Sequence, residues 1–313
     1  MKPLRIGTRG SALALWQANH FRGALKQTCG LDAEIVVIKT SGDQNVAMPA
    51  QQIGVIGIFT KELEDSLLDG RADLAVHSMK DVPTEFSDVC RIATVFQRED
   101  PRDALVSLRG ETLAQLPQGA RIGTSSLRRA SQLRWFRPDF QIAELRGNVD
   151  TRLRKVAAGE YDAIVLAKAG IDRLGLSSRI TEVLSPEVML PAVGQGALGV
   201  EFCEPRRDEF KVLDLLMDQD TMRAVKAERA LLAEVQGGCR LPLGAWARIE
   251  NGAMVLDARV LSEDGVQCMR WRAEKVCNSA ADAENLGRAV AAELLAAGAD
   301  QLLRMVGRSV GYA

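Results

Sequence analysis

A lysine and an aspartate stand side by side where a buried strand is expected to end, in the segment Val76–Pro83 (Val-His-Ser-Met-Lys-Asp-Val-Pro). The carboxyl ends of strands are where open α/β sheets bind ligands. Lys80 and Asp81 therefore form either a structural ion pair or a catalytic site in which the lysine tunes the carboxylate pKa. His77, close by, is expected to be a packed core residue rather than a proton carrier.

Cys239 lies in a loop and follows two glycines, Gly237 and Gly238. Small neighbours leave its thiol accessible to a bulky group, and the cation of Arg240 favours the thiolate. A structural thiol remains the alternative, and it is the expected role of the five other cysteines, most of which lie inside helix or strand patterns: Cys29, Cys90, Cys203, Cys268 and Cys277.

The segment Gly123–Arg129 (Gly-Thr-Ser-Ser-Leu-Arg-Arg) follows one expected strand and begins a helix. Backbone N–H groups, hydroxyls and the helix dipole converge there, which favours an anion site over a capping turn with solvated arginines. Arginine also binds carboxylates or phosphates through two parallel hydrogen bonds. From residue 121 to 154 there are eight arginines and only three acidic residues; the arginines are numbers 121, 128, 129, 134, 137, 146, 152 and 154.

Gly194–Gly199 matches the dinucleotide-binding pattern GxGxxG, but its context argues against that function. The pattern requires a following helix, whereas Val200-Glu201-Phe202 is strand-like. These glycines are expected to form a tight crossing between domains. The six scattered cysteines contain no CxxC pair and the two histidines have no ligand spacing, so no metal site is expected.

The first two-thirds of the chain alternates short β-type runs with helical stretches, which indicates an α/β architecture. A long loop is expected over 40–57. Strands are expected at 4–7, 34–39, 72–76, 121–123, 141–143 and 163–167, and helices at 11–27, 59–68, 126–136 and 149–158.

The last third predicts a small α+β domain with a three-stranded antiparallel sheet. Asn251-Gly252 and Asp264-Gly265 are hairpin signals between its expected strands. The strands are expected at 245–249, 253–260 and 266–273, and helices at 221–235 and 279–297.

Length and composition limit the number of domains and the class of protein. At 313 residues the chain suits two or three domains, and 47% hydrophobic with 26% charged residues is ordinary globular composition. No run of 18 apolar residues and no secretory signal are evident, and the unpaired cysteines suit a reducing compartment, so a cytoplasmic protein is expected. The net charge of −1 favours no class of macromolecular partner.

Taken in order, these segments resemble the porphobilinogen deaminase (hydroxymethylbilane synthase) family from residue 5 to 244. The residues that carry the resemblance are 5–14 (RIGTRGSALA), 59–64 (FTKELE), 75–83 (AVHSMKDVP), 98–104 (REDPRDA), 123–129 (GTSSLRR), 145–149 (LRGNV), 191–197 (PAVGQGA) and 237–239 (GGC).

The resemblance implies three domains. Domain 1 spans 1–97 and 192–216, and domain 2 spans 98–191; both are similar to the α/β halves of a periplasmic binding protein. Domain 3, residues 217–313, carries the cofactor cysteine.

The implied enzyme is a transferase that joins four porphobilinogen units head to tail, with loss of ammonia, and then releases hydroxymethylbilane by hydrolysis. Its cofactor is a dipyrromethane attached to Cys239 by a thioether, and Asp81 is the catalytic carboxylate. The other implied cofactor contacts are Ser11, Lys80, Ser126, Arg128, Arg129 and Arg146. The implied substrate contacts are Arg9, Phe59, Arg152 and Arg173. A cytoplasmic monomer with no nucleic-acid or membrane partner is expected.

One departure from the family lies in its flexible lid. Ile56 stands where a lysine is frequent in the family, and Gln52 replaces another. The cleft arginines remain, so the resemblance still implies a site for carboxylate-bearing rings.

Two other classes of function are alternatives to the enzyme. A non-catalytic, two-lobed anion-binding protein would not need a cysteine in a glycine loop, nor a third domain. A nucleic-acid binder would need aromatic side chains among its cations, but aromatic residues make up only 4% and the net charge is slightly negative.

Overall fold

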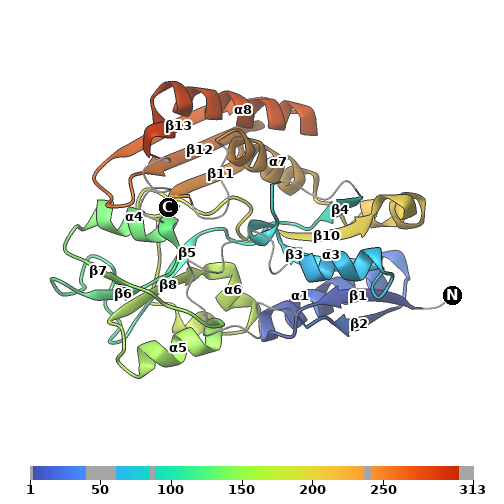
Figure 1. The fold of residues 1–313 in the computed structure, drawn as a ribbon, viewed down its shortest axis with the longest axis horizontal. Coiled ribbons are helices and arrows are strands. Elements are labelled where there is room, and N and C mark those ends of the chain that lie inside the picture. The colour runs from blue at the N-terminus through green and yellow to red at the C-terminus, as the bar shows by residue number, and fades with distance from the viewer. Residues whose placement is uncertain (1–2, 40–60, 85–88, 236–240, 303–313) are drawn as a thin grey trace, which may run out of the picture. The chain divides into compact units, whose positions relative to one another are not determined.

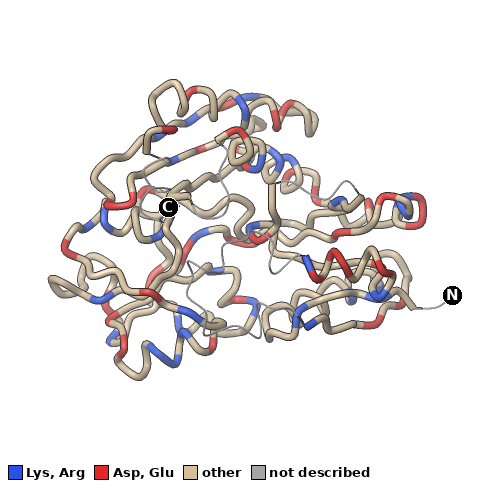
Figure 2. The backbone as a smooth tube through the Cα atoms, in the orientation of Figure 1, with Lys and Arg blue, Asp and Glu red and all other residues tan. Residues whose placement is uncertain are grey.

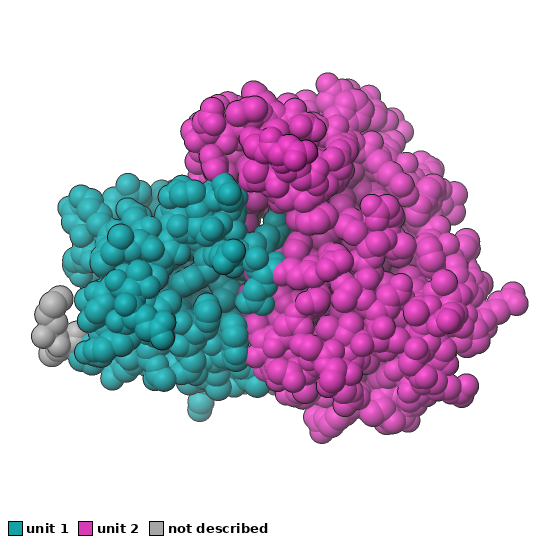
Figure 3. All heavy atoms as spheres, turned by 180° about the vertical axis from the view of Figure 1, so that it is seen from behind, with its two compact units in different colours: residues 1–99, 197–222 teal, residues 100–196, 223–313 magenta. Residues whose placement is uncertain are grey.

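The computed structural model describes residues 3–39, 61–84, 89–235 and 241–302. They divide into two compact units, coloured separately in Figure 3. Unit 1 comprises residues 1–99 and 197–222, and unit 2 comprises 100–196 and 223–313. The chain passes from unit 2 back to unit 1 between Gly196 and Ala197, within the glycine pattern described above. Gly194 and Gly196 both have positive φ, 70° and 87°, which explains the glycines in this turn.

Unit 1 is built on a five-stranded mixed sheet in the order β2-β1-β3-β10-β4 (Figure 1). Its first three strands run parallel, and β10 is antiparallel to both of its neighbours. The strand bounds are β1 Leu4–Thr8, β2 Ala33–Val37, β3 Leu74–Ser78, β4 Cys90–Val95 and β10 Leu198–Cys203. The helices are α1 Ala12–Ala24, α3 Lys61–Leu68, the π-helical η1 Leu25–Cys29 and the 3₁₀ segments η2 Met79–Asp81 and η4 Glu204–Leu216.

Unit 2 contains a second five-stranded sheet with the equivalent arrangement, β7-β6-β8-β5-β9. Here β7, β6 and β8 are parallel, and β5 is antiparallel to β8 and β9. The strands are β5 Asp103–Ser107, β6 Arg121–Gly123, β7 Gln141–Ala143, β8 Ala163–Ala167 and β9 Glu182–Val183. The helices are α4 Leu127–Phe136, α5 Val149–Ala157, α6 Lys168–Arg173 and the 3₁₀ turn η3 Ser177–Arg179.

The C-terminal part of unit 2 is a three-stranded antiparallel sheet, β11-β12-β13. Its elements are β11 Leu243–Glu250, β12 Ala253–Leu261, β13 Cys268–Lys275, α7 Gln219–Glu234 and α8 Ala280–Ala296; α7 begins in unit 1. Alternate residues of β12, such as Met254, Leu256 and Ala258, share a buried core with residues of both helices. In Figure 1 the two helices lie along one face of this sheet.

The expected fold class is confirmed: two α/β sheets and a three-stranded antiparallel sheet. The hairpin at Asn251-Gly252 has φ of 50° and 83°, as a turn with two left-handed residues requires. The main differences concern β4, β5 and β9, which the sequence pattern did not predict. Helix 11–27 is also shorter as an α-helix, because it changes to a π-helix at Leu25.

Candidate active site

Asp81 and Lys80 lie on the single 3₁₀ turn η2 that follows β3. Met79 anchors this turn: its side chain is buried, and its backbone N–H donates to the Ala197 carbonyl at 3.0 Å. A Cβ at Gly199 on the neighbouring strand β10 would collide with the Met79 sulfur, so the Met79 side chain packs directly against this glycine. Packing of Met79 therefore fixes the position from which Asp81 projects.

A small pocket of about 80 Å³ opens at this end of the unit 1 sheet, and Arg9, Ser11 and Asp81 all line it. Ser11 also caps α1, because its hydroxyl accepts a hydrogen bond from the Ala14 N–H at 3.3 Å. Gln17, which is buried, donates from Nε2 to the Ser78 hydroxyl at 2.9 Å. Three of the predicted site residues thus converge on one pocket, in which Asp81 is the carboxylate.

Lys80 is half-buried on the same turn and is not among the residues that line the pocket. His77 does line it, but its ring is 5% exposed and its Nε2 lies 2.7 Å from Oε2 of the buried Glu201. The expectation that His77 is a packed core residue is confirmed by this burial.

Arg128 and Arg129 lie at the beginning of α4 and converge on one carboxylate. Nη1 of Arg128 donates to Oδ2 of Asp103 at 2.7 Å, and Nη2 of Arg129 donates to Oδ1 at 2.7 Å. Gln195 donates to the same Oδ1 at 3.0 Å. Asp103 is fully buried, and the two arginines are 5% and 6% exposed. We call Asp103, Arg128, Arg129 and Gln195 the Asp103 cluster.

The electrostatics of this cluster follow from its burial. Burial alone would raise the pKa of Asp103, but the charges and hydrogen bonds of Arg128 and Arg129 outweigh it and hold that pKa well below its usual range. Burial in turn lowers the pKa of Arg128, against the opposing attraction of Asp103. Two guanidinium groups against one carboxylate leave one excess positive charge at a helix N-terminus, which favours an anion.

Asp103 and Gln195 were not predicted as site residues, although both lie within segments that carry the family resemblance. The signal available in the sequence was Asp103 at the start of a short apolar run, Ala104–Val106, since a carboxylate there needs a buried cation as partner.

The remaining arginines that were predicted to bind substrate or cofactor lie elsewhere in unit 2. Arg173, 7% exposed at the end of α6, donates to the Gly196 carbonyl at 2.9 Å. Arg146 pairs with Glu144 at 2.7 Å, and Arg152 donates to the Gly147 carbonyl at 2.8 Å. Ser126 is the N-cap of α4 and accepts from the Arg129 N–H at 3.5 Å.

Four predicted positions, Cys239, Phe59, Ile56 and Gln52, lie outside the described residues, as does the expected loop 40–57.

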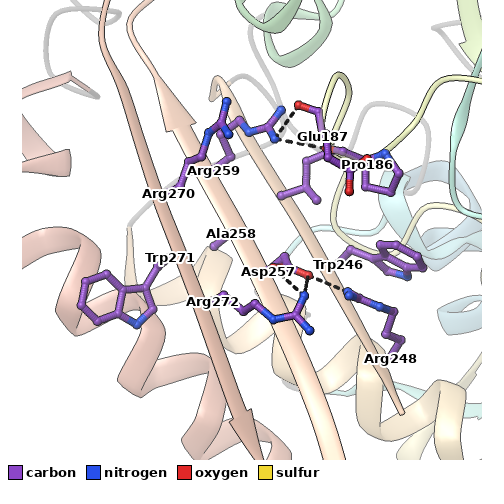
Figure 4. Close-up of a pocket in the computed structure, with 11 residues that line it drawn as sticks. Pro186, Glu187, Trp246, Arg248, Asp257, Ala258, Arg259, Arg270, Trp271 and Arg272 are labelled. Carbon is purple, nitrogen blue, oxygen red and sulfur yellow. Dashed lines mark hydrogen bonds and ion pairs between the residues drawn. The ribbon is translucent and has the colours of Figure 1, made fainter. Parts of the chain in front are cut away.

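A second pocket, of about 410 Å³, lies on the face of the C-terminal sheet that is opposite its core (Figure 4). Arg248 and Arg272 both reach Asp257, at 2.7 and 3.3 Å. Arg259 is buried and donates to the Pro186 and Glu187 carbonyls. Most of these cations already have a partner, either within the sheet or in the segment that contains Pro186 and Glu187. The pocket is therefore lined mainly by an ion-pair network. Figure 2 shows that basic and acidic residues occur in both units.

Comparison with known proteins identifies the class to which this fold and these sites belong. The model of the porphobilinogen deaminase dipyrromethane cofactor-binding domain matches residues 4–211, and the model of the porphobilinogen deaminase C-terminal domain matches residues 222–296. The chain belongs to the porphobilinogen deaminase family.

Curated relatives match over nearly the whole chain. A porphobilinogen deaminase of Syntrophobacter fumaroxidans is 46% identical over 310 residues, which cover 98% of each chain. One of Nitratidesulfovibrio vulgaris is 47% identical, again over 98% of each chain. One of Geobacter metallireducens is 47% identical over 97% of this chain and 95% of the relative.

Among solved structures, a periplasmic substrate-binding protein of an ABC transporter from Coxiella burnetii matches with a TM-score of 0.43 and 16% identity, over 68% of this chain and 90% of that chain. The fold class therefore stands on the three observed sheets themselves. Within the described residues, no helix is both long enough and apolar enough to cross a membrane.

Proposed function

We propose that this enzyme condenses four porphobilinogen units head to tail on a covalently held dipyrromethane, releases ammonia at each addition, and hydrolyses the product to hydroxymethylbilane, with Asp81 as its catalytic carboxylate. Porphobilinogen deaminase activity in tetrapyrrole biosynthesis follows from the family. The observation that supports this role for Asp81 is its place in a pocket shared with Arg9 and Ser11 at the end of β3.

Asp81 suits the difficult step because expulsion of ammonia leaves an electron-poor pyrrole. A fixed carboxylate accepts the pyrrole N–H and stabilises positive charge as it develops. The same group can take up the proton that leaves when the new ring regains aromaticity. Arg9 in the same pocket carries the charge needed for an acetate or propionate group of the substrate.

The dipyrromethane supplies, when bound, the terminal pyrrole to which further units are added. We propose that Cys239 holds it through a thioether and that six further residues contact it: Ser11, Lys80, Ser126, Arg128, Arg129 and Arg146. The excess positive charge of the Asp103 cluster supports this assignment, since guanidinium groups at a helix N-terminus bind carboxylates.

For the growing chain we propose Arg9, Arg152 and Arg173 as contacts, together with Phe59. Arg173 is held in place by its bond to the Gly196 carbonyl, and Arg152 by its bond to the Gly147 carbonyl. An arginine fixed in this way loses little further rotamer entropy when it binds a carboxylate.

The intact mass of the purified protein tests whether the cofactor is covalently attached to Cys239. Purified wild-type protein is expected to carry an adduct of two pyrrole units, and Cys239→Ser is expected to lose both the adduct and nearly all turnover. Cys203→Ser is the matched control and should keep both. A fully active wild type without an adduct would show that the cofactor assignment is wrong, and an inactive one would favour the two-lobed anion-binding protein.

Steady-state turnover of the primed enzyme tests Asp81. Asp81→Asn should retain the fold and the primer but lose most activity, because an amide neither stabilises the cation nor exchanges its proton. Asp81→Glu retains the charge in a displaced position and should be less damaged. Turnover of Asp81→Asn near the wild-type value would leave Asp81 a structural residue.

The three-domain division at 1–97 with 192–216, 98–191 and 217–313 is also proposed. Its support is that each of the three sheets has a hydrophobic core of its own. We further propose that the enzyme is a cytoplasmic monomer whose small-molecule partner is porphobilinogen. Size-exclusion chromatography with light scattering tests the oligomeric state.

A further inference from the structure

Four side chains of unit 1 whose groups can ligate a metal ion lie on one side of its sheet: Glu64 of α3, Cys90 of β4, and Glu201 and Cys203 of β10. We call them the thiol–carboxylate cluster. The ligand atoms of Glu64, Cys90 and Glu201 all lie within 4.8 Å of one another, and the Cys203 sulfur lies 3.9 Å from that of Cys90. None of the four lines the pocket that contains Asp81.

Sheet register explains this gathering. Cys90 and Cys203 are directly opposite each other in the antiparallel pair β4 and β10. Glu201 is two residues before Cys203, so its side chain points to the same face. The pairing of these strands shifts between Val200 and Glu201, and such irregularities commonly redirect side chains near functional sites. Helix α3, labelled in Figure 1, contributes Glu64.

We propose that the thiol–carboxylate cluster is a binding site for one thiophilic divalent cation, of which Zn²⁺ is the best match. Two sulfurs bound to a tetrahedral zinc ion at about 2.3 Å are about 3.8 Å apart. The observed 3.9 Å between Cys90 and Cys203 already meets this requirement. The carboxylates of Glu64 and Glu201 supply the two remaining ligands.

The donor set also selects among metals. Magnesium and calcium prefer oxygen ligands alone, whereas a mixture of two thiolates and two carboxylates suits zinc. Cys90 and Glu201 are 0% and 3% exposed, so an ion held here is shielded from water. His77 hydrogen-bonds to Oε2 of Glu201 at 2.7 Å, and a histidine of this kind orients a ligating carboxylate from behind.

Binding is expected to release protons. Burial raises the pKa of the Cys203 thiol, as do the nearby charges of Glu201 and Glu64. Each cysteine binds a metal ion as the thiolate, so its S–H proton has to leave when the ion binds. One Zn²⁺ binds, two S–H bonds break, two Zn–S bonds form and two protons leave to the solvent, with no change in oxidation state.

Direct metal titration tests the proposal on the holoenzyme, in which Cys239 carries its thioether, under a phosphine reductant. Zinc is added as the chloride and measured by competition with a chromophoric chelator. Wild type is expected to bind one Zn²⁺ per chain, and Cys90→Ser or Cys203→Ser to weaken binding at least tenfold. Cys277→Ser is the matched control, because Cys277 is a buried thiol outside the cluster, and it should bind as wild type does.

Cobalt provides a readout that needs no variant. Co²⁺ added to the wild-type holoenzyme should give thiolate-to-metal charge-transfer absorption in the near ultraviolet and tetrahedral bands in the visible, and Zn²⁺ should displace both. Binding without the thiolate band, equal zinc affinity in the folded Cys90→Ser and Cys203→Ser variants, or no binding at all overturns the proposal. Because turnover is not the readout, the result is independent of the roles proposed for Asp81 and Cys239.

Discussion

Two groups of arginines and carboxylates in unit 2 use the same chemistry in opposite environments. In the Asp103 cluster the carboxylate is fully buried and both arginine side chains are less than a tenth exposed. On the outer face of the C-terminal sheet, Asp257 accepts from Arg248 and Arg272, whose side chains are 20% and 53% exposed (Figure 4). We call this second group the Asp257 pairs.

The difference teaches that geometry alone does not set the value of an ion pair. The arginine nitrogens in both groups lie within 3.3 Å of their carboxylate oxygens. Water screens the Asp257 pairs, and exposed pairs contribute about 0–1 kcal/mol. In the Asp103 cluster each charge has lost its hydration, so removal of one partner leaves another charge buried and unpaired, at a cost of about 3–5 kcal/mol.

Asp103→Asn is expected to have the largest effect on stability. The amide keeps the shape but removes the negative charge, which leaves Arg128 and Arg129 buried without a counter-ion. We expect the free energy of unfolding to fall by about 3–5 kcal/mol in chemical denaturation. The matched control, Asp257→Asn, should lose less than about 1 kcal/mol. Equal losses in the two variants would break the comparison.

The Asp103 cluster and the Asp257 pairs should also differ in how they contribute to stability at acid pH. The pKa of Asp103 is depressed in the folded protein, so its contribution is complete above the unfolded carboxyl pKa of about 3.9 and is lost as the pH falls toward the folded value. Below about pH 4, wild type is therefore expected to lose up to about 1.4 kcal/mol per pH unit through this group. Denaturation curves of Asp103→Asn should lack that component, and those of Asp257→Asn should retain it.

Arg129→Lys should have an intermediate effect. The lysine keeps the charge but loses the fork by which Nε and Nη2 both donate to Oδ1 of Asp103, at 3.1 and 2.7 Å. It also loses the bond from Nη1 to the Val165 carbonyl. We expect a loss of about 1.5–3 kcal/mol in the free energy of unfolding, in line with hydrogen bonds to charged groups. A loss near zero would mean that charge alone, without fork geometry, holds the cluster.

Arg272→Ala is expected to have the smallest effect, about 0–1 kcal/mol. Its guanidinium reaches Glu250 at 3.1 Å and Asp257 at 3.3 Å from an exposed position. Whatever effect exists should shrink further at high salt, since screening weakens exposed pairs. Thermal denaturation at low and high ionic strength measures this. A large effect that does not depend on salt would place the Asp257 pairs in the same class as the Asp103 cluster.

The fold was predictable where the signals are local. Ser11 and Ser126 cap the helices that their positions predicted, and Asn251-Gly252 forms the expected hairpin. Strands β4 and β5 were missed because their identity depends on pairing with β10 and β8, distant in the chain. A short apolar run does not specify its partner strand.

The candidate site shows the same division. The sequence indicated that Asp81 follows a buried strand, and it does, on the turn anchored by Met79. It predicted Arg128 and Arg129 as an anion site but not their buried counter-ion Asp103, 25 and 26 residues away. Nor did any spacing indicate that Cys90 and Cys203, 113 residues apart, would lie opposite each other.

By itself, the sequence determined the helix caps, the hairpin and the order of the family segments, and hence the reaction. Each of these features depends on residues that are neighbours in the chain. The tertiary structure decided which charged side chains are buried away from water. It surrounded Asp103 with Arg128 and Arg129 in the interior and left Asp257 only half-buried, although both are aspartates in strands that also contain apolar residues. The physical reason is that desolvation depends on everything packed around a group, and that environment is assembled from segments far apart in the chain.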